Sequence, residues 1–222
     1  MFDYNEYIKK LDVKFTPILT HNFNLLSKGK LTKTFGNRIV TSIIGDPFHG
    51  AYTNWREKYV QNFGFVLYSK DWIKPLSKWI GDRPCLEIMA GSGMLSYFLS
   101  LYGVKIRATD NFSWKNTSWF IKNEFSVENL DCIEAIRKYG RDVKFVICSW
   151  PYMDNNAFLC LQEMRKVNPK CRMIYIGEGM GGCTANDNFF ETAEYIDLNT
   201  FDKAVSKYSI WEGIHDNIFL FK

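Results

Sequence analysis

The chain has 222 residues, of which 46% are hydrophobic and 17% aromatic, so it can bury a sizeable core without disulfides or structural metals. No apolar run approaches the roughly 18 to 20 residues of a membrane span, and the first ten residues lack the basic and then apolar layout of a secretory signal. These features indicate neither a membrane-spanning helix nor a secretory signal, and they predict a globular, cytoplasmic protein without a membrane partner.

The formal net charge of +4 is distributed unevenly along the chain. Residues 1–40 contain seven Lys/Arg and three acidic residues, whereas the remaining residues balance at 21 against 21. A basic N-terminal arm could contact the phosphates of a nucleic acid, and a solvated surface that keeps the protein soluble explains the same pattern. Both alternatives stay open.

The cysteines and histidines show no metal-ligand spacing. The six cysteines form no C-x-x-C pair, and the three histidines are far apart in the sequence. Several of the cysteines lie inside apolar runs, where cysteine packs as a small hydrophobic residue. We therefore expect reduced, mostly buried cysteines and no metal site.

Residues 1–80 differ in composition from the rest of the chain, being rich in Tyr, Phe, Trp and Lys. We expect a mainly helical N-terminal extension that forms a cap or lid. One of its helices is predicted over 69–81, with a shared apolar face formed by Trp72, Leu76, Trp79 and Ile80. Within 48–59, four residues could close over a substrate, although packing of the rings in a core is the favoured interpretation: His49, Tyr52, Asn54 and Trp55.

From residue 84 onward, short apolar runs alternate with helical patterns, which is typical of a parallel sheet covered by helices. Strands are expected over 84–89, 104–110, 126–131, 143–149 and 171–178. Helices are expected over 94–103, 112–125, 132–140, 156–167 and 187–195. Two further strands, 207–213 and 215–222, would form a terminal antiparallel hairpin. The predicted fold is α/β and Rossmann-like: a doubly wound, mostly parallel, seven-stranded sheet spanning a domain of residues 81–222.

A glycine turn follows the first expected strand, in the stretch "LEIMAGSGMLS". Glycine lets the backbone turn sharply and approach a ligand, and the following helix presents unpaired N–H groups. A tight strand-to-helix turn can also require glycine for geometry alone. The acidic Glu87 within the strand distinguishes this turn from a dinucleotide fingerprint, because a carboxylate in the pocket would repel a pyrophosphate.

Two acidic residues follow the next two expected strands. Asp110 lies 17 residues beyond Gly93, where an acid can bind the two hydroxyls of a ribose. Asp131 follows the third strand, where an acid could accept a hydrogen bond from the exocyclic amine of a nucleobase. Both dinucleotides and S-adenosylmethionine use pockets of this kind.

Together these residues resemble the class I S-adenosylmethionine-dependent methyltransferases, over roughly residues 80–222. The first motif of that family, an acid followed by a glycine turn and a helix, corresponds to Glu87-Ile-Met-Ala-Gly91-Ser-Gly93, with Met89 where a glycine is common. The resemblance implies S-adenosyl-L-methionine as cofactor, with the glycine turn under its methionine part, Asp110 on its ribose and Asp131 near its adenine. Phe112 could pack on the adenine face or belong to the core. The cofactor residues so implied are Glu87, Met89, Ala90, Gly91, Gly93, Asp110, Asn111, Phe112, Asp131, Cys132 and Ser149.

The fourth expected strand ends in Ser149-Trp150-Pro151-Tyr152. This tetrapeptide resembles the motif of family members that methylate amino or amide nitrogens, namely Asp, Asn or Ser followed by Pro-Pro and an aromatic residue. Trp150 replaces the first proline. The resemblance implies that the Ser149 hydroxyl and the Trp150 carbonyl accept N–H bonds from the substrate, that Pro151 fixes the turn and that Tyr152 stacks on the substrate, with Asp154 as a nearby helper. A strand end that packs its rings in the core is the structural alternative.

The leading hypothesis is therefore an S-adenosylmethionine-dependent methyltransferase acting on a nitrogen of a nucleobase in DNA or RNA, a small amine or amide, or a protein side chain. A catalytically inactive module that keeps the pocket is the alternative, supported by the departures at Met89 and Trp150. A nicotinamide-dependent reductase is disfavoured by Glu87 and by the absence of an evident proton relay.

Overall fold

The computed structural model describes residues 20–35, 56, 59–116, 125–211 and 213–222. Much of the predicted N-terminal cap, including all four residues named above within 48–59, lies outside these ranges. None of the helices in the described ranges has the length and apolar character that a membrane crossing requires.

A six-stranded sheet forms the centre of the described chain, in the order β3-β2-β1-β4-β5-β6. Its strands are β1 (Cys85–Ile88), β2 (Ile106–Asp110), β3 (Glu128–Asn129), β4 (Phe145–Ser149), β5 (Arg172–Gly177) and β6 (Asn217–Phe221). The first five are parallel, and β6 pairs antiparallel with β5. The five parallel strands were all predicted. For β1, β4 and β5 the reason is that strands buried on both faces appear in the sequence as short, mostly apolar runs.

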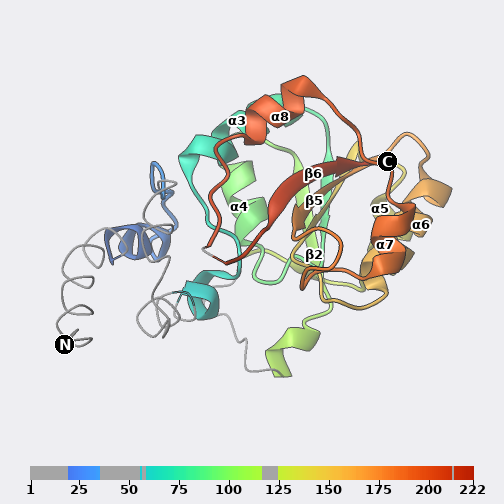
Figure 1. The fold of residues 1–222 in the computed structure, drawn as a ribbon, viewed down its shortest axis with the longest axis horizontal. Helices are drawn as coiled ribbons and strands as arrows, with labels where there is room; N and C mark the ends of the chain where they lie inside the picture. The colour runs from blue at the N-terminus through green and yellow to red at the C-terminus, as the bar shows by residue number, and fades with distance from the viewer. Residues whose placement is uncertain (1–19, 36–55, 57–58, 117–124, 212) are drawn as a thin grey trace, which may run out of the picture.

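Helices cover both faces of the sheet (Figure 1). One face carries α3 (Lys70–Ile80), α4 (Met94–Ser100) and α8 (Asn199–Val205), and the other carries α5 (Cys132–Tyr139), α6 (Asn156–Val167) and α7 (Asp187–Thr192). Alternate residues of one strand pack into the two layers: Phe145 and Ile147 into the first, Val146 and Cys148 into the second. This period of two is the expected geometry of a doubly covered strand.

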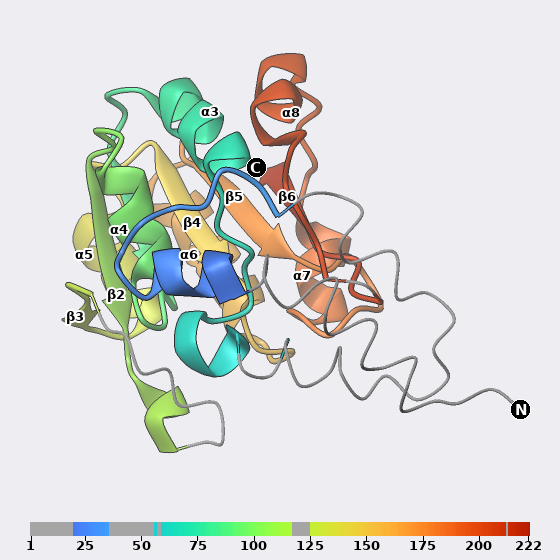
Figure 2. The same ribbon diagram turned by 90° about the vertical axis from the view of Figure 1, so that its left-hand side faces the viewer.

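The described part of the N-terminal region packs into the first of these layers. Leu26, Phe63 and Leu67 belong to the same buried cluster as the sheet residues of that face. Residues 20–35, drawn in blue in Figure 2, lie beside α4, where the hydroxyl of Tyr97 donates to the carbonyl of Gly29 at 3.4 Å. The chain before β1 therefore contributes directly to the core of the sheet domain.

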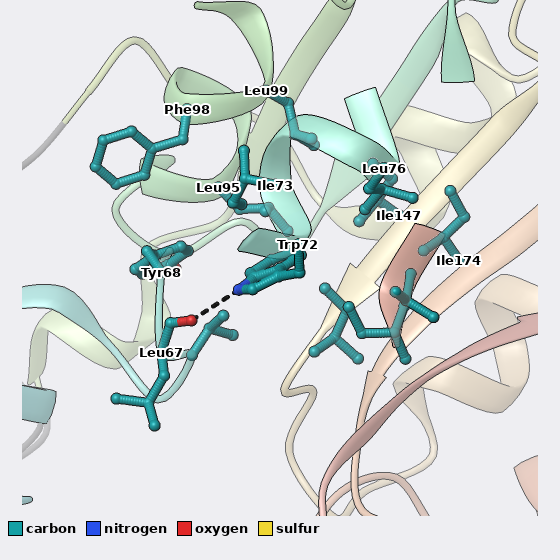
Figure 3. Close-up of a cluster of buried hydrophobic side chains, with 14 of the residues drawn as sticks. Leu67, Tyr68, Trp72, Ile73, Leu76, Leu95, Phe98, Leu99, Ile147 and Ile174 are labelled. Carbon is teal, nitrogen blue, oxygen red and sulfur yellow. Dashed lines mark hydrogen bonds between the residues drawn. The ribbon is translucent and has the colours of Figure 1, made fainter. Parts of the chain in front are cut away.

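The apolar face predicted for the helix over 69–81 exists and anchors α3. Trp72, Leu76 and Ile80 are fully buried, and Ile73 joins them. Figure 3 shows Trp72 at the centre of this cluster, with its indole N–H donating to the carbonyl of Leu67 at 2.9 Å. Trp79 is only partly buried and packs at the side of the cluster.

The predicted terminal hairpin is replaced by a different arrangement. Residues 207–211 form no strand in the described structure, where the outer edge of β6 pairs instead with residues 194–196. Ile196 donates to the carbonyl of Leu220 at 2.8 Å, and Lys222 donates to the carbonyl of Glu194 at 2.8 Å. The edge that a 207–213 strand would need is thus occupied, and the described sheet has six strands where seven were expected.

The helix expected over 112–125 is present only as the short 3₁₀ turn η2 (Ser113–Asn116) in the described residues, since 117–124 lie outside them. The short helix α8 was not predicted. All six cysteines are free, and five of them are buried, with Cys183 exposed.

Candidate functional site

A pocket opens at the carboxyl edge of the sheet, between the ends of β1 and β4. The chain continues from β1 toward β2 and β3 on one side and from β4 toward β5 on the other. The segments that leave these two paired strands therefore run in opposite directions and leave a crevice between them, which is where open α/β sheets bind ligands. The lining residues in the described chain are Phe63, Gly64, Phe65, Val66, Tyr68, Glu87, Met89, Ala90, Gly91, Ser92, Asp110, Asn111, Ser113, Trp114, Cys132, Ser149, Trp150, Pro151, Tyr152 and Asn156.

Glu87 is a buried carboxylate at the inner wall of this pocket. Its Oε2 accepts hydrogen bonds from the Ser96 main-chain N–H at 3.1 Å and from the Ser96 hydroxyl. Ser96 lies in the first turn of α4, whose N-cap Gly93 has no side chain to offer. Glu87 therefore supplies the acceptor that a capping side chain would otherwise provide. Burial raises the pKa of Glu87 to about 7, and the hydrogen bonds from Ser96 limit that rise.

The glycine turn leads from β1 into α4 through several left-handed residues. Met89, Gly91 and Gly93 have φ angles of 51°, 56° and 75°. The backbone at Met89 thus has the conformation that glycine adopts most readily, although the side chain is methionine. Gly93 does not line the pocket: a Cβ there would meet Val127 Cγ2 at 2.5 Å, so this glycine is required for packing.

Asp110 ends β2 and lines the pocket with a buried side chain. Its Oδ2 accepts from the Gly91 N–H at 2.8 Å, while Oδ1 accepts from the Phe112 N–H at 2.6 Å and from the Trp114 indole N–H at 3.1 Å. Burial raises the pKa of this carboxyl, and these three hydrogen bonds counteract the rise. Because a carboxylate has about four acceptor positions, one remains for a ligand hydroxyl.

Besides Gly93, two more of the predicted cofactor residues lie outside the lining. Asp131 is the N-cap of α5, and its Oδ1 accepts from the N–H groups of Ile133 at 2.9 Å and Glu134 at 3.4 Å. Phe112 lies under the ammonium of Lys115, whose Nζ is 4.2 Å from the ring centroid. Neither is among the lining residues, whereas the neighbouring Cys132 and Asn111 are.

Ser149 and Trp150 form the opposite wall of the pocket, at the end of β4. No side-chain hydrogen bond engages the Ser149 hydroxyl within the described part of the chain, so it can accept from a ligand. Trp150 has a φ of 50°, and its main-chain N–H donates to the carbonyl of Ile176 at 2.7 Å. Its ring stacks on Phe65, with centroids 4.7 Å apart and planes 12° from parallel.

A buried carboxylate fixes the Trp150 ring from behind. The indole N–H donates to Asp216 Oδ2 at 3.1 Å, and the Tyr208 hydroxyl donates to the same oxygen at 2.5 Å. Asp216 Oδ1 is buried without a hydrogen-bond partner among the described residues, and burial raises the pKa of this group. A proline at 150 could not make the indole contact, so the tryptophan links the pocket wall to the start of β6.

The remaining residues of the motif have different environments. Pro151 is buried and Tyr152 is 49% exposed, and both line the pocket. Asp154 does not line it: its carboxylate accepts from the Asn156 N–H at 2.9 Å and from the Asn156 side-chain amide at 2.8 Å. Asn156, which was not predicted, reaches the pocket.

Sequence reasoning missed the part of the pocket contributed by residues 63–68. Phe65 and Tyr68 come from the region before the sheet domain, and no periodic pattern relates them to the strand ends. Trp114 was also missed. Its signal is its position four residues after Asp110, which brings the indole N–H to that carboxylate.

The charge of the pocket is one-sided. Its described lining contains the two carboxylates Glu87 and Asp110, several aromatic rings, and no Lys, Arg or His. Carboxylates and aromatic faces attract cations. The lining is therefore suited to an uncharged or cationic ligand and unfavourable for phosphate groups.

Glu178, after β5, lies outside this lining. Its carboxylate accepts from the main-chain N–H groups of Cys183 at 2.8 Å and His215 at 2.9 Å. Burial raises the pKa of Glu178, but the hydrogen bonds from the Cys183 side chain and from the His215 and Cys183 main chain, together with the charge of His215, outweigh burial and hold the pKa below its ordinary value. The carboxylate thus ties the loop after β5 to the start of β6.

Searches with the sequence found no matching family model and no matching curated protein. Several solved structures align with parts of this chain at low similarity. An S-adenosylmethionine-dependent methyltransferase from Archaeoglobus fulgidus aligns with a TM-score of 0.43 at 15% identity, over 77% of this chain and 99% of that one. Human N-acetylserotonin methyltransferase, solved in complex with S-adenosylmethionine, aligns with a TM-score of 0.43 at 12% identity, over 91% and 65%.

An S-adenosylmethionine-dependent methyltransferase from Agrobacterium tumefaciens aligns with a TM-score of 0.36 at 13% identity, over 50% of this chain and 44% of that one. The aligned region thus spans less than half of the Agrobacterium protein. With TM-scores below 0.5, these likenesses identify neither an activity nor a substrate for this chain.

Proposed function

We propose that this protein is an S-adenosylmethionine-dependent methyltransferase, and that its acceptor is an amino or amide nitrogen. The observation that carries the proposal is the meeting of Glu87, Asp110 and Ser149 from three different strands in one pocket. These residues are far apart in the sequence, and each was singled out separately: Glu87 as the acid of the first motif, Asp110 for the cofactor ribose and Ser149 as an acceptor for the substrate.

The charge of the pocket favours this cofactor over a dinucleotide. S-adenosylmethionine carries a positively charged sulfur and no phosphate, which suits a lining with two carboxylates, aromatic rings and no described cationic side chain. A dinucleotide would bring two negative charges to the first turn of α4. There the Glu87 carboxylate already accepts from the Ser96 N–H, so a pyrophosphate would meet repulsion.

Individual residues of the pocket fit the parts of the cofactor. Asp110 retains an acceptor position for a ribose hydroxyl, and the turn at Ala90 and Gly91 supplies backbone at the pocket wall. Trp114, held against Asp110, and Cys132 provide apolar surface for a purine. We propose that Asp131 supports the cofactor site indirectly: its carboxylate caps α5, the helix that begins with the pocket residue Cys132.

The acceptor side of the proposal rests on Ser149, Trp150 and Tyr152. An amine conjugated to a ring or a carbonyl attacks poorly because its lone pair is delocalised. The Ser149 hydroxyl and the Trp150 carbonyl would accept its N–H bonds and direct the lone pair toward the methyl group. Tyr152, half exposed at the pocket, would stack on a flat substrate.

The cofactor supplies a methyl group already activated by the sulfonium, so the protein contributes mainly orientation. Holding the nitrogen in line with that methyl group can lower the barrier by about 7 to 11 kcal/mol in favourable cases. The methylated ammonium loses its proton readily, which removes the need for a strong base. Asp154, exposed and bonded to Asn156, is a proposed helper at most.

An inactive, cofactor-binding module is the second candidate, and one observation favours it. Three of the acceptor positions of Asp110 and the indole of Trp150 are engaged within the protein itself. Such a pocket could be maintained for binding alone.

Mass spectrometry of the ligand that copurifies with the protein, followed by a labelled-methyl screen of nucleic acid, protein and metabolite pools, tests the proposal. We expect S-adenosylmethionine or its demethylated product in the pocket and label on a nitrogen. Ser149→Ala should keep cofactor affinity and lower turnover. Cofactor binding without transfer to any pool would favour the inactive module, and loss of binding in Ser149→Ala would mean that the serine is a structural turn residue.

A further inference from the structure

A second cleft opens at the opposite, amino edge of the sheet, with a volume of about 450 Å³. Its charge is the reverse of that of the first pocket: five lining side chains are cationic, and none of the described lining residues is acidic. The lining residues are Trp79, Arg83, Lys144, Phe145, Pro169, Lys170, Cys171, Arg172, Leu198 and Lys222.

The fold gathers these cations from separate parts of the sequence. Parallel strands begin at one edge of a sheet, so Arg83 before β1, Lys144 before β4 and Lys170 before β5 lie at the same edge. Arg172 begins β5 beside β4, and its N–H donates to the carbonyl of Lys144 at 3.2 Å. Because β6 is antiparallel, its last residues return to this edge and bring Lys222.

Most of this positive charge has no counterpart among the described residues. Lys222 pairs with Glu194 at 3.4 Å, but the described chain offers no ion pair to Arg83, Lys144, Lys170 or Arg172. Like charges held around one cleft repel one another, and an anion in the cleft would relieve that repulsion.

Arg83 is held rigidly at the wall of the cleft. Its guanidinium carbon lies 4.6 Å from the Trp79 ring centroid and 4.9 Å from that of Phe145. Its Nε donates to the carbonyl of Ile80 at 2.7 Å, and a terminal nitrogen donates to the carbonyl of Trp79. Lys144, Lys170 and Arg172 are exposed, so their charged groups can move to meet a ligand.

We propose that this amino-edge cleft binds a ligand with several phosphate groups close together, such as a stretch of nucleic-acid backbone or a free polyphosphate. Guanidinium and ammonium groups are the side chains that bind phosphate, the guanidinium through paired N–H donors and the ammonium as a point charge. A cleft of this volume is in the range of small-ligand sites, large enough for a few phosphate groups. The inference does not depend on the function proposed for the carboxyl-edge pocket.

Two probes and two triple variants test this site. The probes are a fluorescently labelled single-stranded RNA of about 15 nucleotides and inorganic tripolyphosphate, measured by anisotropy and calorimetry over a range of salt concentrations. Lys144→Gln/Lys170→Gln/Arg172→Gln removes the exposed cations of the cleft. Lys74→Gln/Lys203→Gln/Lys207→Gln removes the same net charge from exposed positions outside it, so it is the matched control.

We expect the cleft variant to bind at least one probe about tenfold or more weakly, with the control variant unchanged. The slope of log affinity against log salt for RNA should fall by about 0.7 for each phosphate that the removed side chains no longer neutralise. Weaker binding of both probes would assign the site to phosphate groups in general, and weaker binding of RNA alone would assign it to a strand. Equal effects in the two variants, or no binding of either probe to the unmodified protein, would overturn the proposal.

Discussion

Glu87 has two roles, one in the structure of α4 and one in the electrostatics of the pocket. Its side chain caps α4 through Ser96, and in its ionised form it contributes negative charge to the pocket. The sequence predicted an acid at this wall, but the capping contact depends on where α4 begins, which the glycine turn determines.

Glu87→Gln should change how stability depends on pH. In the folded protein the pKa is raised to about 7 from 4.5, so the folded state holds a proton that the unfolded state has already lost. That stabilisation is fully present below the unfolded pKa and is lost as pH rises through 7, an effect of roughly 3 kcal/mol. Denaturant titrations from about pH 5 to 8 should therefore show the wild-type protein losing stability relative to the variant. A constant difference across that range would contradict the raised pKa.

Trp150 has a structural role that the sequence motif did not indicate. The motif identified it as a substitution for proline, and the structure adds a bond to the buried Asp216 that no local pattern indicates. The partner lies 66 residues away, so only the folded sheet brings the two side chains together.

Trp150→Phe keeps an aromatic ring to stack on Phe65 but removes the indole N–H. Asp216 then depends on Tyr208 alone, and the free energy of unfolding should fall by roughly 1.5 to 3 kcal/mol. The matched control is Trp79→Phe, whose indole N–H bonds an exposed Thr200 hydroxyl and should cost less. In a protein that already carries Asp216→Asn, Trp150→Phe should lower the free energy of unfolding by less than it does in the wild type. Equal losses in both tryptophan variants would mean that the bond to Asp216 contributes little.

At the scale of elements, the two turns that flank α4 each contain a glycine with a positive φ, but the two glycines are required for different reasons. Gly93 has a φ of 75° and no space for a side chain, while Gly103, with a φ of 86°, has no heavy atom within 4 Å of the position that a Cβ would take. Glycine is thus required at Gly103 only for its backbone conformation, and at Gly93 both for that conformation and for the lack of space for a side chain.

Gly103→Ala should therefore lower the free energy of unfolding by about 1 kcal/mol, through backbone strain alone. Gly93→Ala should cost roughly 1 to 3 kcal/mol more, because its Cβ would lie 2.5 Å from Val127 Cγ2. Adding Val127→Ala should recover part of the second cost and none of the first. Equal stability of the two glycine variants in thermal unfolding would show that the segment around Val127 yields without cost.

The elements also show where sequence patterns lose information. The parallel strands were predictable because β1, β4 and β5 are almost wholly buried and apolar. The seven-residue helix α8 buries only Phe201, Ala204 and Val205, too few for a clear period. Residues 207–213 resemble a strand locally, but residues 194–196 take the edge of β6 that such a strand would need.

For the molecule as a whole, the sheet separates charge between its two edges. The carboxyl edge presents two carboxylates and aromatic rings, and the amino edge presents a cationic cleft. The modest net charge of +4 gives no indication of this separation. Likewise, the contribution of Phe65 and Tyr68 to the pocket could not be predicted, since it depends on how the chain before β1 crosses the strand ends.

The binding of S-adenosylmethionine at the carboxyl-edge pocket is the central claim, and calorimetric titration tests it most directly. The wild-type protein should bind S-adenosylmethionine and not a nicotinamide dinucleotide. Asp110→Asn should weaken that binding about 10- to 100-fold, because it removes the charged acceptor at the pocket wall. Asp142→Asn, an exposed control outside the pocket, should bind as the wild type does. Binding of the dinucleotide instead, or equal affinity for S-adenosylmethionine in all three proteins, would contradict the account.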